Sequence, residues 1–304
     1  MKTKFLSVLL FLFLIMGIGG CENKESVPII EEPIDFCLID GEPAWSPDGK
    51  WIAFYHDDSL FSKAGIYLIS PDGANIRKCQ DGIAETPAWS PDGQWIVFSK
   101  NAQIWKKKID GDSLTQLTFE GRNFFPSWSP DGQWIAFDGW IPDEMKFYGI
   151  FKMDKSGKEK TLFGYDVNGA IRMPTWANNS TIIHIRYSQQ FYLPEIFSMK
   201  SNGKNEVRLT FNNANDYYPK FSNNRIAFTS KPHDKPHFGI WTMDADGSNL
   251  KQLTDTQAYT CDWSPDGKHI VYNDARAKNG RLWIMDADGS NKRQLTFDYH
   301  FTNF

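Results

Sequence analysis

One pentapeptide, Trp-Ser-Pro-Asp-Gly, occurs four times in this chain, at residues 45–49, 89–93, 128–132 and 263–267. Two less regular copies follow the same plan, with Trp176 and Phe221 at the position of the pentapeptide's first residue. The six marker positions are 45, 89, 128, 176, 221 and 263, with steps of 44, 39, 48, 45 and 42 residues. A period in the forties that recurs six times indicates a repeat architecture.

Each repeat contains four short stretches with the character of β-strands, separated by turn residues. In the third repeat these stretches are residues 125–129, 134–138, 149–153 and 159–162. The sequence Ser-Pro-Asp-Gly between the first two predicts a tight turn, because proline fixes φ and glycine accepts a positive φ. Asp-Gly, Ser-Gly or Asn-Gly between the last two is again typical of a hairpin.

Six such units in tandem predict an all-β fold, a six-bladed β-propeller with four antiparallel strands per blade, since closure into a ring protects the sheet edges. Eleven of the twelve tryptophans recur at three repeat positions, and we interpret them as packing between blades. Residues 35–40 either lie beside the last blade and help to close the ring, or leave residues 293–296 to complete the sixth blade alone. We expect the propeller at residues 41–304, with blades at about 41–81, 82–120, 121–164, 165–212, 213–256 and 257–304.

The repeat resembles a known family. The core Pro-x-Trp-Ser-Pro-Asp-Gly-x-x-Ile-x-Phe, followed by Ile-Trp-x-Met-Asp-x-Asp-Gly-Ser-Asn and then Gln-Leu-Thr, is similar to the TolB-type, WD-like propeller repeat over about residues 41–297. This resemblance implies a six-bladed propeller whose commonest role is to bind another protein in the bacterial envelope. TolB itself carries an α/β domain ahead of its propeller, whereas only about twenty residues separate the predicted export signal from the first blade here, so the resemblance does not extend to TolB's own partners.

The N-terminus has the plan of an export signal. Residues 1–20 begin with Lys2 and Lys4, continue as an apolar run and end on small residues before Cys21. That order resembles a bacterial lipoprotein box, which implies a lipidated Cys21; the alternatives are an ordinary signal with nearby cleavage or an uncleaved anchor. We expect residues 21–40 to form a lipidated tether and a possible closing strand. The predicted location is the cell envelope, as a periplasm-facing or surface lipoprotein, with the outer membrane favoured over the inner.

Charge and motifs exclude several functions. Removal of residues 1–20 leaves 31 basic and 37 acidic residues, a net charge of −6, which argues against nucleic acid and against a membrane contact other than the lipid anchor. The Asp-x-Asp-Gly sequences at 244–247 and 286–289 lack the glutamate that completes an EF-hand, so we predict no metal and no cofactor. Besides Cys21, the cysteines are Cys37, Cys79 and Cys261, and their pairing stays open. No nucleophile elbow, zinc-protease motif or phosphate loop is present, and we predict a protein that is not an enzyme.

Recognition is expected on one face of the ring. The turns on one face are short and uniform, whereas the connections on the other vary and carry Tyr, Phe and Arg. We therefore predict an interaction scaffold for envelope proteins, with partner- or ligand-binding candidates Arg122, Phe124, Arg172, Asp216, Tyr217 and Tyr259. The alternatives are that these side chains only plug the channel, that the channel mouth binds a small ligand or glycan, or that the chain is a uronate lyase using Arg122, Arg172, His237 and His300.

Overall fold

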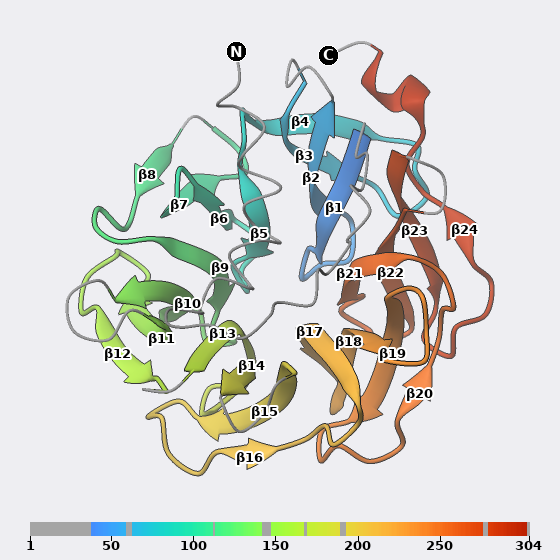
Figure 1. The fold of residues 1–304 in the computed structure, drawn as a ribbon. Coiled ribbons are helices and arrows are strands. Elements are labelled where there is room, and N and C mark those ends of the chain that lie inside the picture. The colour runs from blue at the N-terminus through green and yellow to red at the C-terminus, as the bar shows by residue number, and fades with distance from the viewer. Residues whose placement is uncertain are drawn as a thin grey trace, which may run out of the picture. The chain divides into compact units, whose positions relative to one another are not determined.

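The computed structural model describes residues 38–58, 63–111, 113–141, 147–166, 169–188, 193–275 and 279–302. The strands of this part form six blades around a central axis (Figure 1). The prediction of an all-β, six-bladed propeller with four antiparallel strands per blade is confirmed. The predicted signal at 1–20, Cys21, the tether and Cys37 lie outside the described residues.

The first three blades follow one another in chain order. Blade 1 contains β1 (Leu38–Trp45), β2 (Ile52–Asp58), β3 (Gly65–Ile69) and β4 (Ile76–Asp81). Blade 2 contains β5 (Glu85–Trp89), β6 (Trp95–Lys100), β7 (Gln103–Lys108) and β8 (Leu114–Gln116). Blade 3 contains β9 (Asn123–Trp128), β10 (Trp134–Ile141), β11 (Phe147–Asp154) and β12 (Thr161–Gly164). The bounds of these last four strands agree with the predicted stretches to within three residues.

The remaining blades repeat the arrangement. Blade 4 contains β13 (Gly169–Asn178), β14 (Thr181–Ser188), β15 (Glu195–Lys200) and β16 (Val207–Arg208). Blade 5 contains β17 (Ala214–Ser222), β18 (Arg225–Pro232), β19 (Gly239–Asp244) and β20 (Lys251–Gln252). Blade 6 contains β21 (Ala258–Trp263), β22 (His269–Asp274), β23 (Asn279–Asp286) and β24 (Arg293–Gln294), followed by the 3₁₀ turn η1 (Asp298–Phe301). In each blade the first strand lies nearest the axis and the fourth at the periphery (Figure 1).

The repeated pentapeptide forms a turn that satisfies its own polar groups. In the first copy the hydroxyl of Ser46 donates to Asp48 Oδ1 at 2.7 Å and accepts the backbone N–H of Trp51 at 2.9 Å. Gly49 has φ of +71°, a conformation that costs glycine little. The same serine and aspartate contacts recur in the turns that begin at Ser90, Ser129 and Ser264. The pentapeptide is therefore explained by local turn chemistry.

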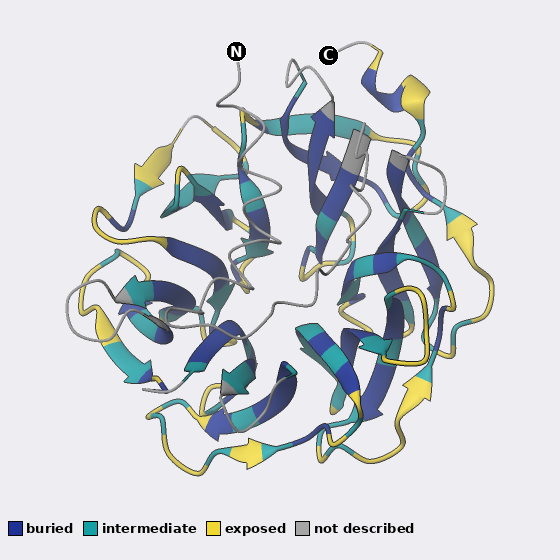
Figure 2. Ribbon diagram, viewed as in Figure 1, coloured by how far each residue is buried: buried dark blue, intermediate teal, exposed yellow. Residues whose placement is uncertain are grey.

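The apolar core lies between the blades. The second strands carry the large buried side chains Phe54, Phe98, Phe137, Phe228 and Tyr272, all with no exposed surface. Figure 2 shows the same gradient, with the second and third strands buried and most of the outermost strands exposed. The tryptophans join neighbours, because the indole N–H of Trp89 donates to the Ala44 carbonyl and that of Trp176 to the Ser127 carbonyl. For these positions, packing between blades is confirmed.

A threonine after the fourth strand ties blades together. Thr118, Thr210, Thr254 and Thr296 each accept a backbone N–H from the third strand of their own blade, at 2.8–3.0 Å. The hydroxyl of Thr296 then donates to Asp40 Oδ2, across 256 residues of sequence, at 2.5 Å. Asp216 receives the matching contact from Thr210 between blades 4 and 5. Blade 6 is thus joined to blade 1 in the same way as blade 4 is joined to blade 5.

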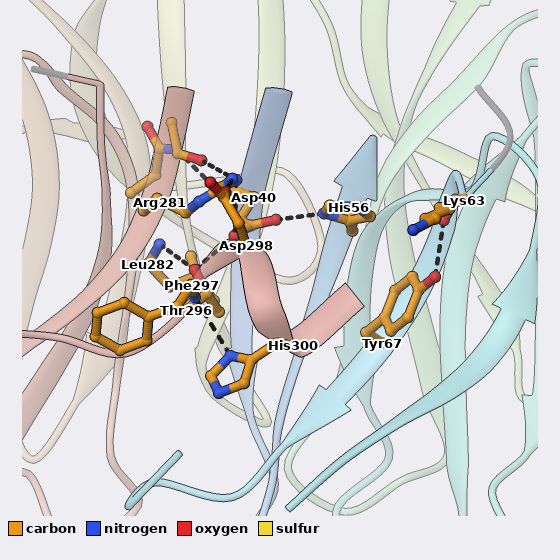
Figure 3. Close-up of polar contacts among 12 residues, drawn as sticks. Asp40, His56, Lys63, Tyr67, Arg281, Leu282, Thr296, Phe297, Asp298 and His300 are labelled. Atoms are coloured by element: carbon orange, nitrogen blue, oxygen red, sulfur yellow. Dashed lines mark hydrogen bonds and ion pairs between the residues drawn. The ribbon is translucent and has the colours of Figure 1, made fainter. Parts of the chain in front are cut away.

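Ring closure uses strand pairing as well as this polar joint. β24 completes blade 6, and Leu38 and Ile39 at the start of β1 also pair in parallel with Asn279 and Gly280 of β23. Asp40 is fully buried there, with its Oδ1 2.6 Å from His56 Nδ1 and its Oδ2 3.4 Å from Arg281 Nη1 (Figure 3). The two closures considered from the sequence therefore occur together.

Two further expectations concern cysteines and membrane spans. Cys79 and Cys261 are both free thiols. Within the described ranges, no helix is both long enough and apolar enough to cross a membrane.

Candidate functional site

The innermost strands run from one face of the ring to the other and line its channel. We call the face at their C-terminal ends, formed by the Ser-Pro-Asp-Gly turns, the turn face. The opposite face carries the connections between blades and between second and third strands, and we call it the loop-rich face. The predicted candidates lie at the loop-rich ends of these strands or in the connections that precede them.

A bulge in the innermost strands decides which side chains enter the channel. Three residues before the marker tryptophan or phenylalanine, the backbone has φ of +52° to +54° in five blades, at Glu42, Thr86, Phe125, Met173 and Tyr218. Residues other than glycine rarely adopt this conformation, and the pairing register slips at the same place in each of these blades. In blade 6 the corresponding residue, Thr260, has no positive φ, and Cys261 follows it instead of the proline found in the other five.

The bulge residues line a cavity on the axis of the ring. Its volume is about 60 Å³. Each blade contributes the residue three positions before its marker, together with the residues that directly follow, to the cavity wall. The residues four before the marker, which include the predicted candidates Phe124, Arg172, Tyr217 and Tyr259, are absent from this wall. Glu42 and Tyr218 are thus site residues that the sequence reasoning missed, and the proline after the bulge was the available signal.

Blades 1 and 2 form an acidic side of the channel. Burial raises the pKa of Glu42 to about 7, although the Thr86 N–H, 2.5 Å from Glu42 Oε2, and the charge of Lys220 both act to lower it. Burial, and then repulsion from Glu42 and Asp57, raises the pKa of Glu85 well above its usual value. Both residues are partly exposed as a whole, while protein surrounds their carboxyls. Among the described residues neither forms an ion pair.

Blades 3, 5 and 6 form an aromatic side. The Phe125 ring centroid lies 5.8 Å from that of Tyr218, which lies 6.3 Å from Tyr217. Phe238 continues the series, at 5.9 Å from Tyr217 and 5.7 Å from Tyr259. These separations are typical of interacting aromatic pairs. Two predicted candidates, Tyr217 and Tyr259, therefore belong to one continuous aromatic surface.

Arg172 lies beside this surface but is committed to an internal ion pair. It is 3% exposed, its Nε lies 3.0 Å from Asp138 Oδ2, and its guanidinium lies 4.1 Å from the centroid of the Tyr148 ring. Burial alone would lower the pKa of Arg172, but Asp138 together with Tyr187 and Tyr148 outweighs burial and raises the pKa. Burial likewise raises the pKa of Asp138, against the opposing effect of Arg172. The charge of Arg172 is therefore largely neutralised before any partner arrives.

The other candidates divide between surface and interior. Arg122 is exposed in the connection before β9, whereas Phe124 is buried in that strand. Asp216 is fully buried at the joint between blades 4 and 5, and burial raises its pKa to about 6 despite the opposing hydrogen bonds from Ser230, Thr210 and Asn212. The structure thus brings Tyr217 and Tyr259 together at the mouth and leaves Arg122 apart from them.

Exposed aromatic side chains lie on the connections of the loop-rich face. Phe119 is 75% exposed, Phe211 73%, Tyr299 63% and Tyr165 52%. Each follows the fourth strand of its blade, in blades 2, 4, 6 and 3 respectively, and so lies where the chain crosses the loop-rich face. We call these four residues the aromatic rim. None of the four was among the predicted binding candidates; the repeated Leu-Thr-Phe at 117–119 and 209–211 was the available signal for Phe119 and Phe211.

Comparison with known proteins agrees with this geometry. The family model of the TolB beta propeller domain matches residues 35–190 and 149–301, and the chain belongs to that family. No curated protein sequence gives a significant match.

Solved structures share the fold. TolB from Acinetobacter baumannii has a TM-score of 0.67 and 20% identity over 87% of this chain, which spans 65% of that one. A putative TolB from Agrobacterium tumefaciens has a TM-score of 0.63 and 21% identity, with 82% of this chain and 90% of that chain covered. An oligogalacturonate lyase in complex with manganese has a TM-score of 0.57 and 14% identity, with 86% and 78% covered. At these identities the likeness concerns the fold alone, and one fold carries many functions.

Proposed function

We propose that this chain is a non-enzymatic TolB-like propeller that binds another protein of the cell envelope through its loop-rich face. The aromatic rim is the observation that carries the proposal. Soluble proteins seldom leave several large aromatic side chains in water on one face, and aromatic residues are enriched at the centres of protein interfaces. The proposal includes a lipid anchor at Cys21 and an envelope location, with the outer membrane favoured.

The energetics favour a protein partner. An aromatic side chain buries roughly 150–250 Å², and each Å² of apolar surface removed from water contributes about 25 cal/mol. Burial of Phe119, Phe211 and Tyr299 would therefore contribute on the order of 10 kcal/mol before the cost of association, which is itself several kcal/mol. Burial of the rim would thus offset much of the cost of association, and the rest of the interface would supply the remainder.

The test is cross-linked isolation of the tagged full-length protein from envelopes of the source organism. The rim variant carries Phe119→Ser, Phe211→Ser and Tyr299→Ser. The matched control carries Leu114→Ser, Val207→Ser and Leu250→Ser, three exposed apolar residues away from the rim. We expect one stoichiometric partner with the wild type and the control, and its loss with the rim variant. Equal recovery with both variants would contradict the proposal.

A second candidate function is the binding of a small ligand or glycan at the channel mouth. The observation in its favour is the cavity on the axis, which all six blades line. A saturable heat signal from a soluble ligand with both wild type and rim variant would support it.

A further inference from the structure

A groove of about 470 Å³ opens on the turn face between blade 6 and blade 1. Its walls come from the Ser-Pro-Asp-Gly turns of both blades, from Trp45 of blade 1, and from Ile284 and Arg293 of blade 6. It shares no lining residue with the cavity on the axis. Ligand pockets in proteins commonly have volumes of about 300–1,000 Å³, so this groove has the size of a binding site.

One repeat position explains why the groove exists. In blades 1, 2 and 3 the residue six positions after the marker is a tryptophan: Trp51, Trp95 and Trp134. Trp51 packs against the apolar cluster that joins blade 1 to blade 2, so this indole fills space between consecutive blades. In blade 6 the same position is His269, which opens β22 as Trp134 opens β10. The groove therefore lies where an imidazole replaces the larger indole.

Blade 6 and blade 1 are no further apart than blade 1 and blade 2. A Cβ added to Gly49 would lie 3.5 Å from Cγ of Pro265, in the turn of the preceding blade. A Cβ added to Gly93 would lie 3.5 Å from Cγ of Pro47, in the equivalent pair of turns. The groove is therefore due to the smaller side chain of His269 and not to a wider junction in the ring.

Blade 1 shows what blade 6 lacks at this place. There the guanidinium of Arg77 lies 5.5 Å from the centroid of the Trp51 ring. Arg293 has the corresponding position in blade 6, because it pairs with Ile284 as Arg77 pairs with Leu68. Blade 6 thus keeps the cation of this arrangement and lacks the indole beneath it.

The walls of the groove suit a flat aromatic ring. Ile284 and Met285 contribute apolar surface, and the partly exposed Trp45 adds an indole. Arg293 is exposed, and its Nη2 donates to the Pro71 carbonyl at 2.7 Å, which holds the guanidinium at the edge of the groove. Arginine stacks on aromatic faces, and an indole is the ring that attracts a cation most strongly.

We propose that this groove binds a tryptophan side chain from an extended segment of another protein, with the indole in the place that Trp51 occupies in blade 1. The guanidinium of Arg293 lies over the indole, and Trp45 and Ile284 pack against it. The groove is larger than one side chain, so the residues on either side of the tryptophan occupy the rest. The site lies on the turn face and goes beyond the proposed function, which concerns the loop-rich face.

The test is fluorine NMR with the full-length protein in detergent and the acetylated, amidated pentapeptide Gly-Gln-Trp-Gln-Gly, fluorinated on its indole. We expect a saturable change in the fluorine shift with the wild type. His269→Trp fills the groove with the residue that the first three blades use, so affinity should fall about tenfold or more, as for the loss of a central interface contact. Thr181→Trp is the matched control, because Thr181 opens β14 of blade 4 as His269 opens β22, and it should bind like the wild type.

A second variant tests the cation without filling the groove. Arg293→Met keeps a long side chain and removes the charge, so affinity should fall about two- to fivefold, the effect of a cation over an exposed aromatic ring. This variant decides the question if His269→Trp does not fold. The unlabelled peptide should displace the fluorinated one, whereas the same peptide with leucine in place of tryptophan should not.

No saturable change with the wild type would overturn the inference. Unchanged affinity in both His269→Trp and Arg293→Met would overturn it as well, and so would equal displacement by the leucine peptide. Equal weakening by His269→Trp and Thr181→Trp would show that the groove is not the site. The rim variant should bind the peptide like the wild type, so failure here is distinguishable from failure of the proposed function.

Discussion

Replacement of Glu42 by glutamine tests the electrostatics of the channel, because the two side chains have nearly the same shape. The pKa of Glu42 is about 7 in the folded protein, against an ordinary value of 4.5. One pKa unit corresponds to about 1.4 kcal/mol, so the difference is worth on the order of 3 kcal/mol of folding free energy. The folded-state pKa is the higher one, so the folded protein binds the proton more tightly than the unfolded chain does. The contribution is therefore fully present below about pH 4.5 and is lost as pH rises through 7.

The assay is urea unfolding of wild type, E42Q and the exposed control E120Q between pH 4 and pH 8. Wild type and E120Q should lose stability over this range more steeply than E42Q, by on the order of 3 kcal/mol. The charge of Glu42 raises the pKa of Glu85, so neutralising Glu42 also lowers the Glu85 pKa, and the measured difference is expected to be larger rather than smaller. If E42Q and wild type stay parallel within about 0.5 kcal/mol at every pH, Glu42 is not strained as a buried charge and the reasoning is refuted.

Three further predictions concern the ring and its anchor. Asp40→Ala leaves Arg281, His56 and Thr296 without their shared partner. Because breaking a buried pair of this kind costs about 3–5 kcal/mol, we expect the free energy of unfolding measured in denaturant to fall by that amount. An unchanged unfolding midpoint would exclude this ring closure. Gly203→Ala would place a Cβ 1.8 Å from the Phe163 carbonyl oxygen, at a residue with φ of +79°. We therefore expect the melting temperature to fall by several degrees. An unchanged melting temperature would contradict the packing of blade 4 against blade 3. Cys21→Ser should release the protein from membranes into the soluble fraction, and retention on membranes would rule out lipid anchoring.

Much of the fold follows from local chemistry that the sequence displays directly. The turns at Ser46 and its three equivalents need only a serine hydroxyl, an aspartate and a glycine a few residues apart, so their pattern predicts four of the six hairpins and the period between them. Ring closure could not be decided in this way. It depends on Asp40 meeting Thr296 across the whole chain, and no local signal encodes that contact.

The candidate site was predicted only in part because a bulge shifts side chains by one position. Strict alternation places Glu85 and Tyr217 at the channel, but the positive φ at the next residue turns Thr86 and Tyr218 into the cavity wall instead. Arg172 illustrates a second limit. Its type suggests recognition, whereas its burial and its partner Asp138, 34 residues away in sequence, emerge only in three dimensions. Residue type alone therefore favours the loop-rich face but does not show which side-chain atoms on it are available.

Photo-cross-linking tests the central claim, that the loop-rich face is the docking surface, most directly. A benzophenone amino acid replaces Phe211 on the aromatic rim or, as the control, Val207 on the peripheral strand β16, two exposed apolar positions four residues apart. After irradiation of living cells, the account predicts one discrete cross-linked species with the probe at 211 and none with the probe at 207. The same species from both positions, or a species from 207 alone, would contradict it.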